Sequence, residues 1–258
     1  MLLPVAALLL AIPEPCYGLE GPAEIEGRHV WVEYPTSVSA AQAMRVLEAA
    51  DTAWEIYAQE LGWTEPPGPI AVRADPSNDM ASGQCITADC DGVAVPVCHV
   101  FGPAFDGGYE EQTTAHEIGH AFQYAYMGSY FDSLASWAWW MEGSATWIEF
   151  HHAPHPRVWS RVDDYVANPQ WTLHNEFADL FEGVRGGHMY GSVVLAFFLE
   201  QYYGGPDTVR ATWEWGAERS GEQIFFRDAI EGIGLSFAQV WPHYLAMMTV
   251  LDFEGGED

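Results

Sequence analysis

Basic residues are scarce in this sequence, and lysine is absent altogether. Its nine basic residues are all arginines, and they face 37 aspartates and glutamates, which gives a formal net charge of −28 at pH 7. Such a chain repels phosphate backbones and anionic membrane surfaces, so we exclude nucleic acid as a partner. The same charge could attract cations or basic polypeptides, but we favour a solvated acidic surface with no dedicated partner.

Long apolar runs are also missing. Met1–Ile12 is almost wholly apolar but too short to span a bilayer, and no longer run follows, so we expect no membrane span. The run is typical of a secretory signal peptide, which predicts a leader over residues 1–18, although no basic residue precedes it. A buried N-terminal segment is the alternative. With a leader, the protein is expected to be secreted, and thus periplasmic or extracellular.

Cysteines are few, and three of the four lie close together. The four are Cys16, Cys85, Cys90 and Cys98. In an oxidising compartment we expect a disulfide in this cluster, but the sequence leaves the pairing open, and loss of Cys16 with the leader would leave an odd number. The absence of CxxC spacing argues against a cysteine-based zinc site.

The remaining pattern predicts an α+β fold. Nearly half of the residues are hydrophobic and 14% are aromatic, which is enough for a sizeable core. Residues 19–108 are predicted to form a sheet-bearing lobe and residues 109–258 a helical lobe of the same domain, which we expect to be a monomer. Alternation predicts strands at 29–34, 70–73, 84–87 and 93–101. Helical periodicity predicts helices at 40–61, with Ser37 or Ser39 as cap, and at 109–127, 134–152, 157–167, 188–203, 207–219, 222–230 and 236–250.

The helix predicted over residues 109–127 contains the pattern HExxH. Residues four apart on an α-helix lie about 40° apart around its axis, so His116 and His120 can bind one Zn²⁺. Glu117 is then placed to act as the general base for a water activated by the metal. Two histidines with no shared ligand are the alternative, since the pattern also arises by chance.

A catalytic zinc needs a third protein ligand, and the next helix offers one. Glu142 follows His120 after 21 residues, a gap that fits a helix end, a loop and an antiparallel helix. Glu149 shares its helix face, so one carboxylate can bind the metal while the other supports a ligand. The alternative is two solvated acids, but the neighbouring tryptophans make this helix apolar, and a carboxylate there needs a partner.

These motifs carry a family resemblance. HEIGHAFQ followed by WWMEGSATWIE resembles the gluzincin zinc metallopeptidases, and the form EGxAxxxE is closer to the peptidase MA-like and aminopeptidase N-type proteins than to thermolysin. The resemblance covers roughly residues 109–204. It implies a thermolysin-like zincin catalytic domain, with Glu142 as the third zinc ligand and Glu149 where related proteins have a second acid.

The resemblance also suggests an oxyanion donor and a substrate strand. Tyr190, or else His188, stands near the start of a helix where related families place a tyrosine that donates to the oxyanion. An aromatic residue that only packs on the core is the alternative. The strand Val93–His99 resembles the edge strand along which such enzymes bind peptides. The GxMEN loop of the aminopeptidases is absent, and Thr146 stands where thermolysin has an aspartate, so the partner of His116 stays open.

The sequence therefore predicts a secreted, zinc-dependent peptidase that acts on a peptide or protein substrate. The alternative is a non-catalytic zinc-binding or scaffold protein that retains the gluzincin fold, although such a protein has no use for Glu117. An acidic calcium-binding protein is a third possibility, but no EF-hand pattern supports it.

Overall fold

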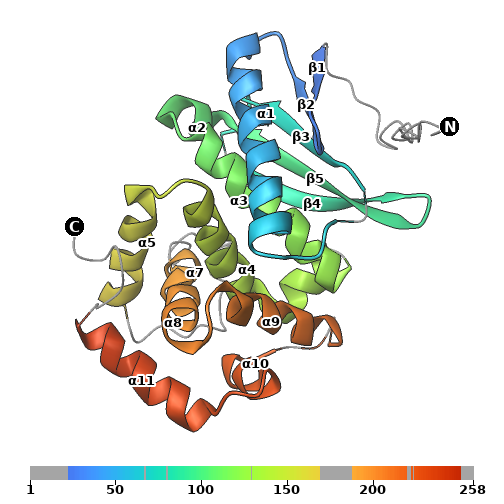
Figure 1. Cartoon of the computed structure of the whole chain (residues 1–258). Helices are drawn as coiled ribbons and strands as arrows, with labels where there is room; N and C mark the ends of the chain where they lie inside the picture. Colours follow the sequence, from blue (N-terminus) through green and yellow to red (C-terminus); the bar gives the residue numbers. More distant parts are fainter. Residues whose placement is uncertain are drawn as a thin grey trace, which may run out of the picture.

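A computed structural model of the chain describes residues 23–66, 68–79, 81–128, 130–168, 188–219, 222 and 224–250, and for residues 130–136, 164, 188 and 250 it describes the backbone alone. The leader predicted over residues 1–18, with Cys16, lies outside these ranges. Within them the fold is α+β, as predicted: a five-stranded sheet is followed by a mostly helical part (Figure 1). None of the described helices is both long and apolar enough to cross a membrane.

The sheet is mixed, and its two outer strands run antiparallel to their neighbours. Its order is β1-β2-β3-β5-β4. The prediction that Val93–His99 is the edge strand is therefore wrong, because β4 lies at that edge. The reason is burial: the apolar β5 takes the enclosed place beside β3, which leaves the more polar β4 outside. The strands are β1 (Ala23–Glu26), β2 (Val30–Tyr34), β3 (Ile70–Asp75), β4 (Gly83–Cys90) and β5 (Val93–Phe101).

Strands β4 and β5 form a hairpin that is closed by a short turn and a disulfide. The loop residues Asp91 and Gly92 have φ values of 55° and 86°, as a type I′ turn requires, and Asp-Gly is a favoured sequence for that turn. A disulfide joins Cys85 to Cys98, which face each other across the two strands. This bond is one that the clustered cysteines predict, and Cys90 is disulfide-bonded as well.

Helix α1 (Ala40–Glu55) packs against the sheet and begins at a capping box. The hydroxyl of Ser39 accepts from the backbone N–H of Gln42, and the Gln42 side chain accepts from the backbone N–H of Ser39. Of the two serines considered as caps, Ser39 is the one used. A π-helical segment, Ile56–Glu60, extends the helix over nearly all of the predicted range 40–61.

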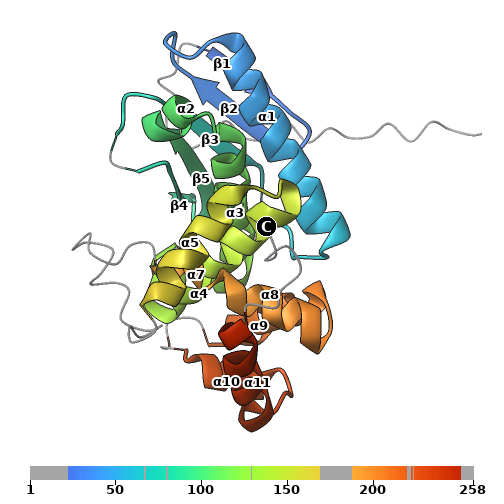
Figure 2. The same ribbon diagram turned by 90° about the vertical axis from the view of Figure 1, so that its left-hand side faces the viewer.

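Helix α3 (Glu110–Met127) lies between the sheet and α4 (Tyr130–His152) (Figures 1 and 2). Two tyrosine hydroxyls fasten it. Tyr57 donates to the carbonyl oxygen of Ala115 over 2.8 Å, and Tyr124 donates to that of Cys85 over 2.6 Å. The helix is thus tied to the segment after α1 and to the edge strand β4.

Apart from α2, which lies beside the sheet, the remaining helices form the second half of the molecule (Figure 2). Helix α2 precedes α3 and was not predicted. The helix predicted over 188–203 is divided at Ser192 into α7 and α8, and the helix predicted from residue 222 begins only at Phe226. One cluster of buried hydrophobic side chains extends from Ile70 of the sheet to Trp213. The bounds are α2 (Gly102–Gly107), α5 (Pro156–Ala167), α7 (His188–Gly191), α8 (Val193–Tyr203), α9 (Pro206–Ala217), α10 (Phe226–Gly232) and α11 (Phe237–Val250).

Candidate metal centre and active site

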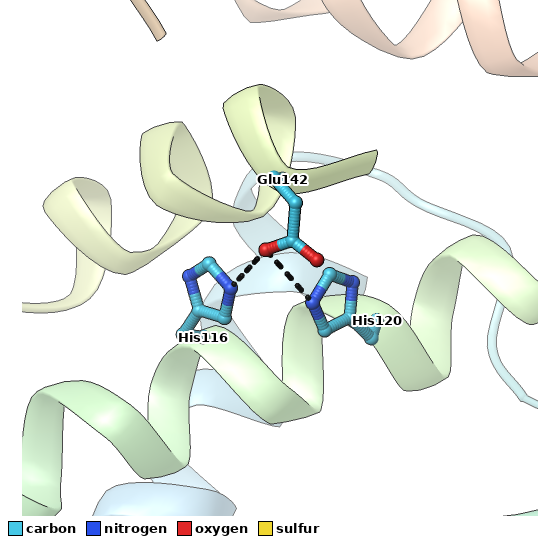
Figure 3. Close-up of side chains that lie close together, drawn as sticks. All are labelled: His116, His120 and Glu142. Carbon is cyan, nitrogen blue, oxygen red and sulfur yellow. Dashed lines mark hydrogen bonds and ion pairs between the residues drawn. The ribbon is translucent and has the colours of Figure 1, made fainter. Parts of the chain in front are cut away.

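Two histidines of α3 face a carboxylate of α4 (Figure 3). His116 and His120 are about one turn apart, so their imidazoles project from the same side of the helix. Their Nε2 atoms lie 3.1 and 3.6 Å from Oε2 of Glu142. One potential ligand atom from each of these residues lies within 4.8 Å of the other two. The structure thus brings together the three residues that the sequence predicts as ligands, and we refer to them as the metal cluster.

Close packing between α4 and α7 fixes the position of Glu142. The residue after it, Gly143, has no room for a side chain, because a Cβ atom there would lie 2.1 Å from Oγ of Ser192. The Ser192 hydroxyl also donates to the carbonyl oxygen of Trp139 over 3.0 Å. The glycine of the Glu-Gly pair therefore allows the close approach that holds the carboxylate opposite the histidines.

The second nitrogen of His116 is held by the other acid of α4. Nδ1 of His116 lies 3.2 Å from Oε2 of Glu149, which answers the question of its partner that the sequence left open. Arg161 of α5 donates to the same oxygen over 3.0 Å and to Oγ1 of Thr146 over 3.0 Å. Sequence reasoning missed Arg161, although it is one of only nine basic residues.

The second nitrogen of His120 is held by an amide on its own helix. Nδ1 of His120 lies 2.8 Å from Oε1 of Gln123. The Gln123 amide is oriented by its NH₂ group, which donates to the carbonyl oxygen of Met141 and to Oγ of Ser144, each over 3.0 Å. Sequence reasoning also missed Gln123. Gln123 could have been found from its position three residues after His120, because this spacing places the two side chains on one helix face.

These partners determine which way the imidazole lone pairs point. The Glu149 carboxylate and the Gln123 amide oxygen accept hydrogen bonds, so Nδ1 carries the proton in both histidines. In a neutral imidazole, Nε2 then directs its lone pair toward the carboxylate of Glu142, and the lone pair and the carboxylate repel each other. The repulsion is removed by a positive charge between the two imidazoles and the carboxylate. Either a proton on each Nε2 or a single bound cation provides that charge. Two oriented imidazoles and a carboxylate are a zinc donor set, so the residues present fit Zn²⁺.

The two acids keep their negative charge at neutral pH. Burial alone raises the pKa of Glu142, but the histidines, His120 foremost, outweigh burial and hold that pKa well below its usual range. For Glu149, burial is outweighed by Arg161 and then by His116, and the pKa lies at about 2. Two negative charges, on the half-buried Glu142 and the buried Glu149, therefore lie beside the histidines, as a cation site requires.

Glu117 lies beside the metal cluster and has fewer hydrogen-bond partners among the described residues than the other carboxylates there. Burial is the main cause that raises its pKa to about 8. Its Oε2 atom is buried and has no hydrogen-bond partner among the described residues. On its other side is Gly83, the first residue of β4, where an added Cβ atom would lie 2.5 Å from Oε1 of Glu117. Gly83 therefore lets the edge strand approach the carboxylate, a role that sequence reasoning did not assign.

A pocket with a volume of about 350 Å³ opens in front of these residues. Its lining comes from four elements: Ser82 and Gly83 at the start of β4, Thr113, His116 and Glu117 of α3, Arg157 and Arg161 of α5, and Tyr190 of α7. The pocket therefore gives access to the carboxylate of the HExxH motif and to one histidine of the metal cluster.

Tyr190, the residue predicted as oxyanion donor, borders this pocket. Its ring centroid is 5.8 Å from that of His116, and the guanidinium of Arg161 lies 4.7 Å from its ring centre. Burial, followed by the charge of Glu142, raises the Tyr190 pKa well above its usual value, so its hydroxyl stays protonated. The other candidate, His188, begins α7, but its side chain lies outside the described part of the chain.

Comparisons with known proteins give a likeness in structure but none in sequence. No protein-family model matches the sequence, and no curated protein is significantly similar to it. Among solved structures, a mutant of an M1 zinc metallopeptidase from Deinococcus radiodurans resembles the chain with 14% sequence identity and a TM-score of 0.47. The match covers 88% of this chain and 50% of that one, so the chain spans about half the length of that protein.

Proposed function

We propose that this protein is a zinc-dependent peptidase that hydrolyses peptide bonds, with Glu117 as general base. The observation that carries the proposal is the placement of Glu117. Glu117 lines an accessible pocket beside three converging metal ligands, and one of its carboxylate oxygens is buried without a hydrogen-bond partner among the described residues. A protein that only stored zinc would need the ligands but not this carboxylate.

His116, His120 and Glu142 would hold the zinc ion. When bound, zinc supplies a Lewis acid that polarises a carbonyl group and lowers the pKa of a water molecule. Glu149 and Gln123 keep the two imidazoles oriented by accepting from their Nδ1–H groups. Arg161 in turn holds Glu149 in place.

The chain's own residues then account for the proton transfers. Glu117 accepts a proton from the attacking water and passes it to the nitrogen of the leaving amine. Its raised pKa suits both roles near neutral pH. Tyr190, with its protonated hydroxyl, donates a hydrogen bond to the oxygen on which negative charge develops. His188 is the alternative donor.

An extended peptide is the substrate shape that the sheet favours. Strand β4 is an edge strand, and its first residue, Gly83, lies next to Glu117. A peptide that pairs with this edge brings its carbonyl groups toward the pocket. We further propose that the protein acts outside the cytoplasm, since the Cys85–Cys98 disulfide suits an oxidising compartment and the sequence predicts a leader.

The decisive experiment compares Glu117→Gln with the wild-type protein. Zinc content is measured by elemental analysis and hydrolysis with a mixture of unstructured peptides. We expect about one zinc per chain in both proteins, and a loss of hydrolysis of about 10²–10⁴-fold in the variant, because an amide cannot accept the proton. Glu111→Gln is the matched control on the same helix, since its side chain is 49% exposed.

The other outcomes are equally informative. Zinc binding without hydrolysis in the wild-type protein contradicts the peptidase and leaves a zinc-binding protein that retains this fold. Equal hydrolysis by Glu117→Gln and by the wild-type protein removes Glu117 from the mechanism.

A further inference from the structure

Arg157 lies on the pocket and is paired with no carboxylate among the described residues. It lies in the first turn of α5, and its guanidinium donates from Nη2 to Oγ of Ser82 over 3.3 Å. The same guanidinium lies 4.2 Å from the ring centre of Tyr109. In the described part of the chain, it makes no ion pair within 4.0 Å.

The other described arginines are different, because each of them lies within 4.0 Å of an acidic side chain. Their partners range from the buried Glu149 to exposed glutamates on helix surfaces. These arginines are Arg28, Arg45, Arg73, Arg161, Arg210, Arg219 and Arg227. In a chain with four acids for each basic residue, an arginine without a carboxylate is the exception that needs a reason.

The surroundings of Arg157 favour the arrival of an anion. Burial lowers the pKa of this guanidinium, and the charge of Arg161 lowers it further, which means that both penalise its positive charge. Glu149, the acid whose charge reaches it, is already bound to Arg161 and His116. An anion placed in the pocket would relieve this penalty.

The position of Arg157 places such an anion close to the proposed catalytic residues. Arg157 lines the same pocket as Glu117 and His116. Its partner Ser82 directly precedes Gly83, where the edge strand approaches Glu117. A ligand group bound by Arg157 therefore lies in the space that a substrate must enter. A guanidinium fits a carboxylate with two parallel hydrogen bonds, a geometry that also fixes the orientation of the ligand.

We propose that Arg157 binds a carboxylate group of the substrate and thereby selects peptides that carry a negative charge close to the scissile bond. This inference rests on the proposed function for the location of the scissile bond. The carboxylate can be the free C-terminus of the peptide or the side chain of an aspartate or glutamate. Both present the same group to the guanidinium, and the experiment separates them.

The test measures binding, so it does not depend on turnover. Benzoyl-glycine and its amide, which differ only in the charged group, are titrated calorimetrically into the purified full chain and into Arg157→Gln. We expect the acid to bind the wild-type protein at least about tenfold more tightly than the amide. Arg157→Gln should weaken binding of the acid by about 10–100-fold and leave the amide unchanged. A carboxylate that binds only zinc would lose no affinity in this variant.

Two further variants separate recognition from folding. Arg157→Lys keeps the charge and should restore part of the affinity for the acid. Arg227→Gln, whose arginine is 66% exposed and pairs with Glu231, is the control and should bind as the wild-type protein does. Equal binding of acid and amide by the wild-type protein, binding of neither, or equal weakening of both by Arg157→Gln overturns the proposal.

The source of the carboxylate is then found with blocked peptides. Benzoylated peptides with an amidated end carry either glutamate or glutamine, and their binding is compared with that of free-acid peptides. Selection of the free acid alone identifies the peptide C-terminus, whereas selection of glutamate in the amidated series identifies an acidic side chain. Peptide hydrolysis is scored separately, so a protein that binds carboxylates without cleaving peptides would refute the proposed function and retain this site.

Discussion

The metal cluster and the pocket wall in front of it are built in opposite ways. In the metal cluster each imidazole has a partner on its far nitrogen, and each partner is itself held by a further hydrogen bond. On the wall, the partners of Arg157 among the residues that the structure describes are a serine hydroxyl and a tyrosine ring. The difference teaches that the metal cluster is preorganised for an ion, whereas the pocket wall keeps hydrogen-bond donors free for a ligand that binds reversibly.

Removal of a ligand from the metal cluster should have the largest effect. His120→Ala and Glu142→Ala each leave two protein ligands, so we expect zinc content to fall from about one per chain to near zero after dialysis. His29→Ala is the control, because that histidine stacks on Trp54 and is not one of the three residues of the metal cluster. Full retention of zinc by both cluster variants would show that the ion, if bound, lies elsewhere.

Removal of one hydroxyl from the wall should have a smaller but specific effect. Tyr190→Phe loses the donor to the developing oxyanion, and we expect kcat to fall by about 10²–10³-fold while zinc content is unchanged. The measurement is steady-state kinetics on the best peptide substrate. Tyr203→Phe, which removes a hydroxyl bound to His243, is the control. An unchanged kcat in Tyr190→Phe would assign the role to another group, with His188 the next to test.

Removal of a supporting charge behind the metal cluster should have the smallest effect. Glu149→Gln keeps the shape of the side chain but weakens its hold on His116 and on Arg161. We expect zinc affinity to fall by about 10–100-fold, as measured by competition with a coloured chelator. An unchanged affinity would mean that the orientation of His116 is fixed by packing alone, and the contrast between the two regions would then be less sharp.

The parts of the site that the sequence predicts are those with a local pattern. The spacing of His116 and His120 follows from helix geometry, and the structure places Glu142 opposite them, as the 21-residue gap suggested. The β4–β5 hairpin was likewise predictable, because Asp91-Gly92 is a turn signal in itself. The histidine pair and the turn each need only a few neighbouring residues, whereas the placement of Glu142 also needs the assumption that the next helix runs back along the first.

The parts that sequence reasoning missed depend on contacts between distant segments. The outer place of β4 depends on its competition with β5 for the enclosed position beside β3, and no single strand contains that information. Strand β1 has only four residues and is held by pairing with β2, and α2 has only six, too few for a helical period to show. Arg157 reaches Ser82 across 75 positions, so only the fold reveals the pair.

The anchoring of α3 has a consequence for how the pocket can move. The Tyr57 hydroxyl binds the backbone of α3, and the Tyr124 hydroxyl of α3 binds the backbone of β4, so both hydrogen bonds oppose a displacement of the helix from its neighbours. Helices α5 and α7 are closely packed, because a Cβ atom at Gly191 would lie 2.6 Å from the carbonyl oxygen of Arg161. Arg161 also donates to Glu149 and Thr146 of α4, so a displacement of α5 that moved Arg157 away from Glu117 would have to break these hydrogen bonds.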